Sequence, residues 1–246
     1  MRVADHGLAH DREWMVVDAT GKFVTQREEP RLALIRPRIA GRSLRLEAPD
    51  AKPLRIALAH EGERVEVNVW RSHCAAFDAG NEAADWLRAV LGRTLRLVRF
   101  DRAKPRLSDR DYTGDVIAPN YFTDGYPVMV LSRASIDDLN ARVGRSFGVD
   151  RFRPNLVLDG VEAYAEDAIH EIDTGDVTLR LVKRCTRCVI ITTNQATGQR
   201  DGDEPLRTLR EYRHDRELRG VAFGINAVIV RGQGAALSAG QEVVVR

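Results

Sequence analysis

Residues 181–191, Leu-Val-Lys-Arg-Cys-Thr-Arg-Cys-Val-Ile-Ile, combine the apolar pattern of a strand with two cysteines three positions apart. These are Cys185 and Cys188, and the chain has only three cysteines in all. Two thiols this close in sequence indicate a redox pair, half of a zinc site, or two small buried side chains. The stretch alone leaves these three interpretations open.

The remaining sequence argues against zinc. A closed zinc site needs four ligands, and the chain has neither a second Cys-x-x-Cys nor a paired histidine motif. Three cysteines are also too few for a disulfide framework. We therefore expect a reducing compartment and a cytoplasmic protein, and we expect no role for the third cysteine, Cys74.

Composition limits the classes of protein to consider. The chain has 246 residues, of which 30% are charged and 43% hydrophobic, as in a soluble globular protein of one large or two small domains. Its net charge of +2 is too small to indicate a nucleic-acid polymer as partner. Residues 1–10 lack a signal-peptide core, and no apolar run could span a bilayer, so we expect no membrane partner.

Short strand patterns and few helices predict the fold class. A helix is expected over residues 81–91, followed by Gly92 as its stop, and further helices begin at Ser135 and Pro205. The polar segment 101–120 reads as a long loop between two lobes. The fold class is therefore α+β and β-dominated. The expected strands are 14–19, 23–26, 44–48, 54–59, 65–70, 94–100, 128–132, 155–158, 177–182, 189–193, 221–230 and 242–245.

Twelve short motifs along the chain carry a family resemblance. They are residues 11–15, 26–30, 124–127, 131–135, 138–140, 151–155, 166–167, 185–188, 204–206, 208–209, 212–213 and 223–226. In this order they resemble the molybdenum-cofactor sulfurase C-terminal (MOSC) domain family with its N-terminal β-barrel companion. Within the family, the chain looks most like the amidoxime-reducing component and its bacterial relatives.

The resemblance implies two domains and a redox function. Residues 1–100 would form the smaller N-terminal MOSC β-barrel domain, and residues 101–246 the β-barrel MOSC domain. The chain would bind the molybdenum cofactor in its molybdopterin form and reduce small N-hydroxylated compounds. Electrons would come from a separate flavin or iron–sulfur protein. Pyridoxal phosphate is not expected, because in full-length sulfurases it belongs to a different domain.

The family motif Cys-x-Arg-Cys implies that Cys188 is the catalytic metal ligand. A soft thiolate suits a redox metal that is also held by the sulfurs of the pterin. The positive charges of Arg184 and Arg187 would favour the thiolate form, and Arg187 is also expected at the cofactor. Cys185 matches a position that is not a ligand in the family, and we expect it to pack.

The resemblance also implies a set of cofactor-binding residues. Arg12, Arg153 and Asn155 match positions that hold the phosphate and the pterin, and a guanidinium fork suits phosphate. Gly125 and Tyr126 match a short segment whose backbone and hydroxyl groups contact the cofactor. The alternatives are an ion pair of Arg12 with Asp11 and a capped turn at residues 153–155.

The chain departs from the family pattern at its first residues. Relatives begin with a strand and a Pro-Val-Lys-Ser turn that also binds phosphate, whereas this sequence starts at Met1-Arg2-Val3. The N-terminal domain would then lack its first strand. Either the start given is downstream of the natural one, or the phosphate site is weaker. The missing motif keeps open the alternative of a cofactor carrier. A third hypothesis is a sulfur-relay protein in which Cys188, as a reactive thiolate, carries a persulfide.

Overall fold

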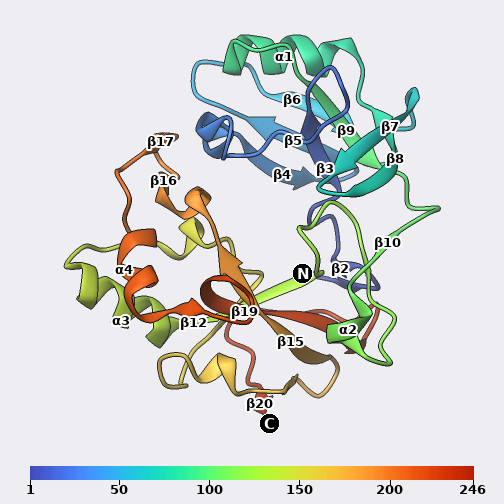
Figure 1. Ribbon diagram of the computed structural model, residues 1–246. Coiled ribbons are helices and arrows are strands. Elements are labelled where there is room, and N and C mark those ends of the chain that lie inside the picture. Colours follow the sequence, from blue (N-terminus) through green and yellow to red (C-terminus); the bar gives the residue numbers. More distant parts are fainter. The chain divides into compact units, whose positions relative to one another are not determined.

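The computed structural model describes residues 1–246, which divide into two compact units. The larger unit contains Met1–Asp11, Leu107–Thr192 and Asp201–Arg246, and the smaller unit contains Arg12–Arg106 and Thr193–Arg200. Strands outnumber helices in both units (Figure 1), which confirms the β-dominated α+β class. No helix is long and apolar enough to cross a membrane.

The smaller unit is built from two antiparallel sheets and one long helix. The sheets have the orders β3-β9-β8-β7 and β4-β5-β6. Helix α1 has the predicted bounds, Asn81–Leu91, and ends at Gly92, whose φ of 67° a glycine adopts without strain. The elements are β3 (Trp14–Val17), η1 (Pro30–Leu34), β4 (Arg36–Ala40), β5 (Ser43–Glu47), β6 (Leu54–Ala57), β7 (Arg64–Val69), β8 (Ser72–Asp78), α1, β9 (Arg96–Phe100), β16 (Thr193–Asn194) and β17 (Gln199–Arg200).

The larger unit is organised around one sheet of order β13-β12-β19-β15-β14-β20, with β18 paired to β19. Its strands are β1 (Val3–Ala4), β2 (Gly7–Leu8), β11 (Pro119–Asn120), β12 (Val128–Ser132), β13 (Leu156–Leu158), β14 (Glu171–Asp173), β15 (Thr178–Arg187), β18 (His214–Asp215), β19 (Gly220–Arg231) and β20 (Val244–Val245). Its helices are α2 (Arg110–Thr113), α3 (Arg133–Val143), η2 (Val149–Arg151), η3 (Ala165–Asp167), η4 (Val189–Thr192) and α4 (Leu206–Tyr212), and β10 (Arg106–Leu107) joins the two units in sequence.

Two hydrophobic clusters fill the larger unit. The first core cluster contains Val3, Leu8, Val128, Val130, Leu158, Ile169, Ile172, Val177, Leu179, Leu181, Ile225, Ala227, Ile229 and Leu237. The second core cluster contains Met129, Leu131, Ile136, Leu139, Phe147, Phe152, Ile191, Leu206, Leu209, Val221 and Phe223. Because β12 alternates between the two, the clusters lie on opposite faces of the sheet. Helices α3 and α4 cover the second (Figure 1).

The long strands β15 and β19 each exchange faces partway along their length. They pair antiparallel with three register shifts. In β15, Leu181 lies in the first core cluster whereas Cys185 packs against the second, although residues four positions apart share a face in a regular strand. In β19, Phe223 lies in the second cluster and Ile225 in the first. Residues two apart share a face in a regular strand, so bulges rotate both strands here.

Gly224 lies in the bulge of β19. The pairs Arg184↔Ile225 and Thr186↔Ala222 leave Cys185 opposite two residues, Phe223 and Gly224. Gly224 has a φ of 76°, and a Cβ added to it would lie 2.7 Å from the Val130 carbonyl oxygen. Only glycine tolerates both the positive φ and the close carbonyl oxygen, so Gly224 fixes the position at which β19 exchanges faces.

We expect Gly224→Ala to lower the free energy of unfolding by about 2 kcal/mol, because it adds left-handed strain to a backbone clash. Urea unfolding measures the change. Gly41→Ala is the matched control, since Gly41 has a φ of 61° but no atom within 4 Å of an added Cβ. An equal loss in the two variants would contradict the close approach at Gly224.

Several predicted elements differ from the structure. Residues 189–193 were expected as a strand, but η4 occupies Val189–Thr192, so that prediction is wrong. Helix α3 starts at Arg133 rather than Ser135, because the Ser132 hydroxyl accepts the Ser135 backbone N–H and caps the helix first. Strands β4 and β8 were not predicted. The exposed side chains of β4 give no apolar alternation, and β8 has three consecutive buried residues.

Candidate functional site

Cys188 directly follows the last residue of β15 and precedes η4. It is a free cysteine, partly exposed, and it belongs to neither core cluster. Cys185, three residues earlier, packs against the second core cluster. Both thiols are partly exposed, but their surroundings differ: Cys185 contacts the second core cluster, whereas Cys188 follows the end of the strand.

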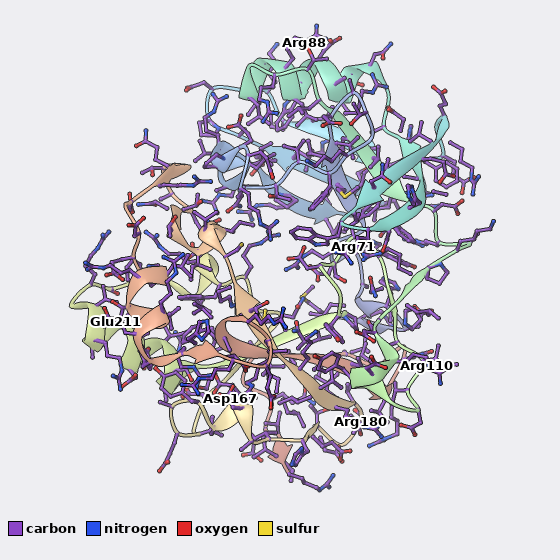
Figure 2. The ribbon with its side chains drawn as sticks, viewed as in Figure 1. Arg71, Arg88, Arg110, Asp167, Arg180 and Glu211 are labelled. Carbon is purple, nitrogen blue, oxygen red and sulfur yellow. The ribbon has the colours of Figure 1, made fainter.

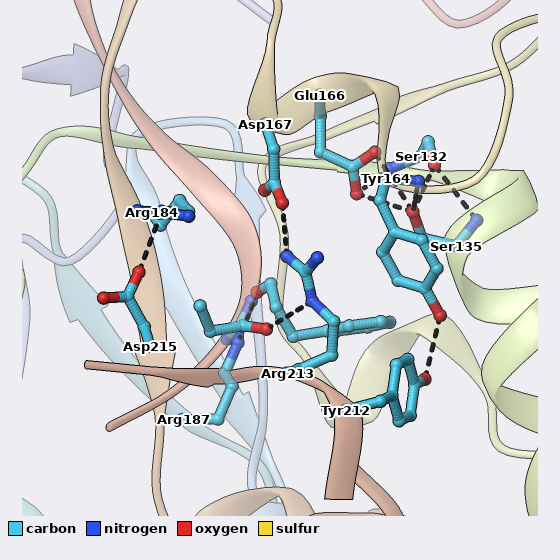
Figure 3. A network of polar contacts seen from close by, with 12 residues as sticks. Ser132, Ser135, Tyr164, Glu166, Asp167, Arg184, Arg187, Tyr212, Arg213 and Asp215 are labelled. Carbon is cyan, nitrogen blue, oxygen red and sulfur yellow. Dashed lines mark hydrogen bonds and ion pairs between the residues drawn. The ribbon is translucent and has the colours of Figure 1, made fainter. Parts of the chain in front are cut away.

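Arg187 connects the end of β15 to two other segments. Its Nε donates to the Phe223 carbonyl at 2.8 Å, and its Nη1 donates to the Phe152 carbonyl at 3.0 Å. Its Nη2 lies 3.5 Å from the Met129 sulfur. Sequence reasoning expected this guanidinium at the cofactor, and in the structure three of its donors meet acceptors of the protein. Figure 3 shows Arg187 beside Arg213 in this region.

Asn155 is held by the backbone of Met129 and by Asp11. The Met129 N–H donates to Asn155 Oδ1 at 2.9 Å, and the Asn155 N–H donates to the Met129 carbonyl at 2.8 Å. The Asn155 Nδ2 donates to Asp11 Oδ2 at 2.8 Å. One Nδ2 hydrogen remains, so the side chain can offer a single donor to a ligand while its orientation stays fixed.

The two arginines expected at the phosphate share an unusual backbone conformation. Arg153 is exposed, with a φ of 53°, and it precedes Pro154. Arg12 has a φ of 51° and is the first residue of the smaller unit, directly after Asp11. Left-handed backbone at a residue other than glycine costs roughly 1–2 kcal/mol. Such strain is retained where the surroundings fix it, and functional sites are common locations.

Tyr126 and Lys183 form a second group in the larger unit. Lys183 Nζ lies 3.8 Å from the ring centroid of Tyr112 and 6.0 Å from that of Tyr126, and the two rings meet edge to face. The Tyr126 hydroxyl oxygen is buried without a hydrogen-bond partner. Burial, and secondarily the charge of Asp109, raises the pKa of Tyr126. Its hydroxyl therefore stays protonated and can donate.

Gly125 precedes this tyrosine and has open space around its α-carbon. No atom lies within 4 Å of an added Cβ, and the Gly125 carbonyl accepts from Asn120 Nδ2 at 3.4 Å. There is thus open space at Gly125, and its contact with the cofactor stays a prediction. Lys183 was missed by sequence reasoning as a neighbour of Tyr126. No local signal could have placed it there, because Lys183 lies 57 residues after Tyr126 in the sequence.

The charge of Arg184 is offset within the protein. Its Nε lies 2.9 Å from the buried Asp215 carboxylate, and its Nη2 lies 3.8 Å from Glu217. Figure 3 draws this pair beside the end of β15. Arg184 was expected to favour the Cys188 thiolate, and the ion pair weakens that influence. Other charged side chains, including Arg88 of α1 and Glu211 of α4, are exposed on their elements (Figure 2).

These groups fit the molybdenum cofactor in two respects. The orphaned Tyr126 hydroxyl lies in the segment expected to contact a polar ligand, and a buried donor without a partner is costly unless a ligand or water completes it. The donor set is also suitable, because a thiol at a strand end can bind a soft metal and the exposed Arg153 guanidinium can bind phosphate. Cys188, Asn155 and Tyr126 belong to the larger unit, in the segments next to β15, β13 and β12, whereas Arg12 belongs to the smaller unit.

Comparisons with known proteins identify two domain families and named relatives. Residues 1–94 match the MOSC N-terminal beta barrel domain, and residues 118–244 match the MOSC domain. The chain is 37% identical to mitochondrial amidoxime reducing component 2 of Rattus norvegicus over 214 residues, with 84% of this chain and 63% of the relative covered.

Similar values hold for two further relatives. Mitochondrial amidoxime-reducing component 1 is 37% identical in Mus musculus and 36% identical in Homo sapiens, covering 85% and 84% of this chain. The chain spans 63% of the length of each relative. A solution structure from Bordetella bronchiseptica covers 41% of this chain and 86% of its own, with 23% identity and a TM-score of 0.36. From its two domain matches, the chain belongs to the MOSC domain family and carries the MOSC N-terminal beta barrel domain.

Proposed function

We propose that this chain is a molybdenum-cofactor-dependent oxidoreductase that reduces N-hydroxylated compounds, with Cys188 as the thiolate ligand to the metal. The observation that carries the proposal is the contrast between the two cysteines of one motif. Both are partly exposed, but Cys185 lies within β15 and packs against the second core cluster, while Cys188 follows the end of the strand and belongs to neither core cluster of the larger unit. The names of the relatives, amidoxime-reducing components, support the reaction class.

Each residue of the proposed site has a physical role. Arg153 would bind the terminal phosphate through charge-assisted hydrogen bonds. Tyr126 would donate its buried hydroxyl to the pterin, the Gly125 backbone would lie against it, and Asn155 would offer its remaining amide hydrogen. Arg187 lies one residue from the metal ligand. When bound, the cofactor would supply the two-electron redox chemistry, and the protein supplies binding and orientation.

The proposed reaction takes two electrons and two protons for each N–OH group. The N–O bond breaks, the nitrogen gains a hydrogen, and the oxygen leaves as water. The electrons would come from a separate donor protein of the flavin or iron–sulfur type. A cytoplasmic location is part of the proposal, because three free cysteines suit a reducing compartment.

Metal analysis with an activity assay tests the proposal. The full chain, produced in cells that make the cofactor, is expected to contain close to one molybdenum per chain. It should reduce benzamidoxime to benzamidine with reduced methyl viologen as the artificial electron donor. Molybdenum without reduction would favour a cofactor carrier. A persulfide on Cys188 without molybdenum would favour sulfur relay, and either result would overturn the proposal.

A further inference from the structure

The bulge of β19 leaves backbone carbonyls that accept hydrogen bonds from arginine side chains. Where two residues oppose one, the regular ladder is interrupted and backbone groups need other partners. The Phe223 carbonyl is bound by Arg187 Nε at 2.8 Å, and the Ala222 carbonyl is bound by Arg213 Nε at 3.0 Å. Two guanidinium groups thus bind consecutive carbonyls at the point where the strand exchanges faces.

Arg213 is itself anchored on both sides. Its Nη2 forms an ion pair with Asp167 of η3, drawn as a dashed line in Figure 3. Its guanidinium lies 4.6 Å from the ring centroid of Tyr164. A charged group with an ion pair and an aromatic face has little freedom. Arg213 therefore fixes the bulge from the side of β18.

Arg187 reaches farther, because it joins the bulge to the loop that carries two proposed cofactor residues. Its Nη1 binds the carbonyl of Phe152, which directly precedes Arg153. Its Nη2 contacts Met129, whose backbone holds Asn155 in both directions. Cys188 is the next residue along the chain. The guanidinium of Arg187 therefore links the end of β15 to the bulge and to residues 152–155, and it fixes their relative positions.

We propose that Arg187 is a positioning residue: it orients Cys188 relative to residues 153–155 through the backbone carbonyls it binds. This inference rests on the proposed function and adds a residue role to it. The planar guanidinium of Arg187 is essential, because its N–H donors point in fixed directions toward separate acceptors. A lysine keeps the charge at this position but offers one nitrogen, which cannot reach the Phe223 and Phe152 carbonyls and the Met129 sulfur together.

Arg187→Lys tests this role through two measurements on the full chain. Loss of a group that orients a metal ligand typically lowers metal affinity about 10–100-fold, and we expect a loss of that size in molybdenum retained after dialysis. Iodoacetamide labelling of Cys188 in cofactor-free protein, followed by mass spectrometry, should become about fivefold faster, since the strand end loses its anchor.

Two matched variants separate positioning from simple stabilisation. Arg180→Lys changes a partly exposed arginine earlier in β15, which pairs with the exposed Asp115, and should leave both measurements within about twofold. Arg99→Lys removes a buried arginine that donates to the Leu58 carbonyl at 2.8 Å in the smaller unit. It should lower the melting temperature as Arg187→Lys does but leave Cys188 labelling unchanged.

The proposal is overturned if Arg187→Lys labels Cys188 and retains molybdenum as the wild type does. It is also overturned if Arg99→Lys speeds Cys188 labelling as much as Arg187→Lys does. Should Arg187→Lys not fold, Arg213→Lys releases the adjacent carbonyl of the same bulge and must speed Cys188 labelling, or the proposal fails. A wild-type chain without molybdenum would refute the proposed function alone, because the labelling experiment uses cofactor-free protein.

Discussion

Under the proposed function, Cys188→Ala is expected to remove molybdenum from the purified protein and to lower reduction of benzamidoxime by about a hundredfold or more, because the metal would lose its protein thiolate. Cys185→Ala should retain both properties. Cys185 is partly buried against the second core cluster, so its replacement removes a small packing contact and should cost about 1 kcal/mol of stability.

The comparison of the two variants is informative because they lie in one motif. Each removes one sulfur, and only one of them removes a sulfur from the strand end. Molybdenum per chain by mass spectrometry and turnover with reduced methyl viologen are the measurements. Cys188→Ser provides a further test, since a hydroxyl is a harder and weaker ligand for this metal, and the same loss is expected. If Cys185→Ala loses molybdenum and activity while Cys188→Ala keeps both, the metal ligand is Cys185 and not Cys188.

Local sequence signals predicted the elements whose determinants are local. Helix α1 has its predicted bounds because its apolar stripe and the glycine after it lie in one window. Strand β12 likewise matches its prediction, Val128–Ser132. The family motifs predicted the domain families correctly, and residues 1–94 and 118–244 match them. These features depend on residues near one another in the chain.

The orientation of the two cysteines could not be read from the sequence. Alternation along 181–191 predicts that residues 181 and 185 share a face, yet Leu181 and Cys185 lie in different core clusters. The cause is the register shift against β19, which is more than thirty residues later in the chain. A strand gives no local signal of where its partner will bulge, because the glycine that permits the bulge is in that partner.

The division into units also depends on long-range contacts. Residues 1–11 belong to the larger unit, and residues 193–200 belong to the smaller one. The second of these segments contains Gln195, whose amide exchanges hydrogen bonds with that of Gln26 at 3.3 and 3.0 Å. The domain boundary predicted from sequence lies at residue 100, directly before the polar segment 101–120. The two units of the structure are instead defined by contacts between residues that are far apart in the chain.

Glu166 forms the most deeply buried acidic contact of the larger unit. It is 0% exposed, and it follows the left-handed Tyr164 in η3. Its Oε1 accepts the Ser132 backbone N–H at 3.2 Å and the Ser135 hydroxyl at 2.8 Å. The Ser135 oxygen in turn accepts the Tyr164 N–H at 2.7 Å. Figure 3 shows these groups together at the start of α3, where the helix dipole favours an acidic oxygen.

Glu166→Ala is expected to lower the free energy of unfolding by about 3–4 kcal/mol, because it leaves a cavity and removes the acceptor of the Ser132 N–H and the Ser135 hydroxyl in the interior. Glu166→Gln retains an acceptor oxygen and should cost about 1 kcal/mol. Glu162→Ala is the matched control: Glu162 is exposed four residues earlier, and its loss should change stability by less than about 0.5 kcal/mol. Urea unfolding of the three variants measures these differences. Because the next residue, Asp167, holds Arg213, the alanine variant should also speed Cys188 labelling. A cost for Glu166→Ala no larger than that for Glu162→Ala would show that the start of α3 is held by the Ser132 cap alone.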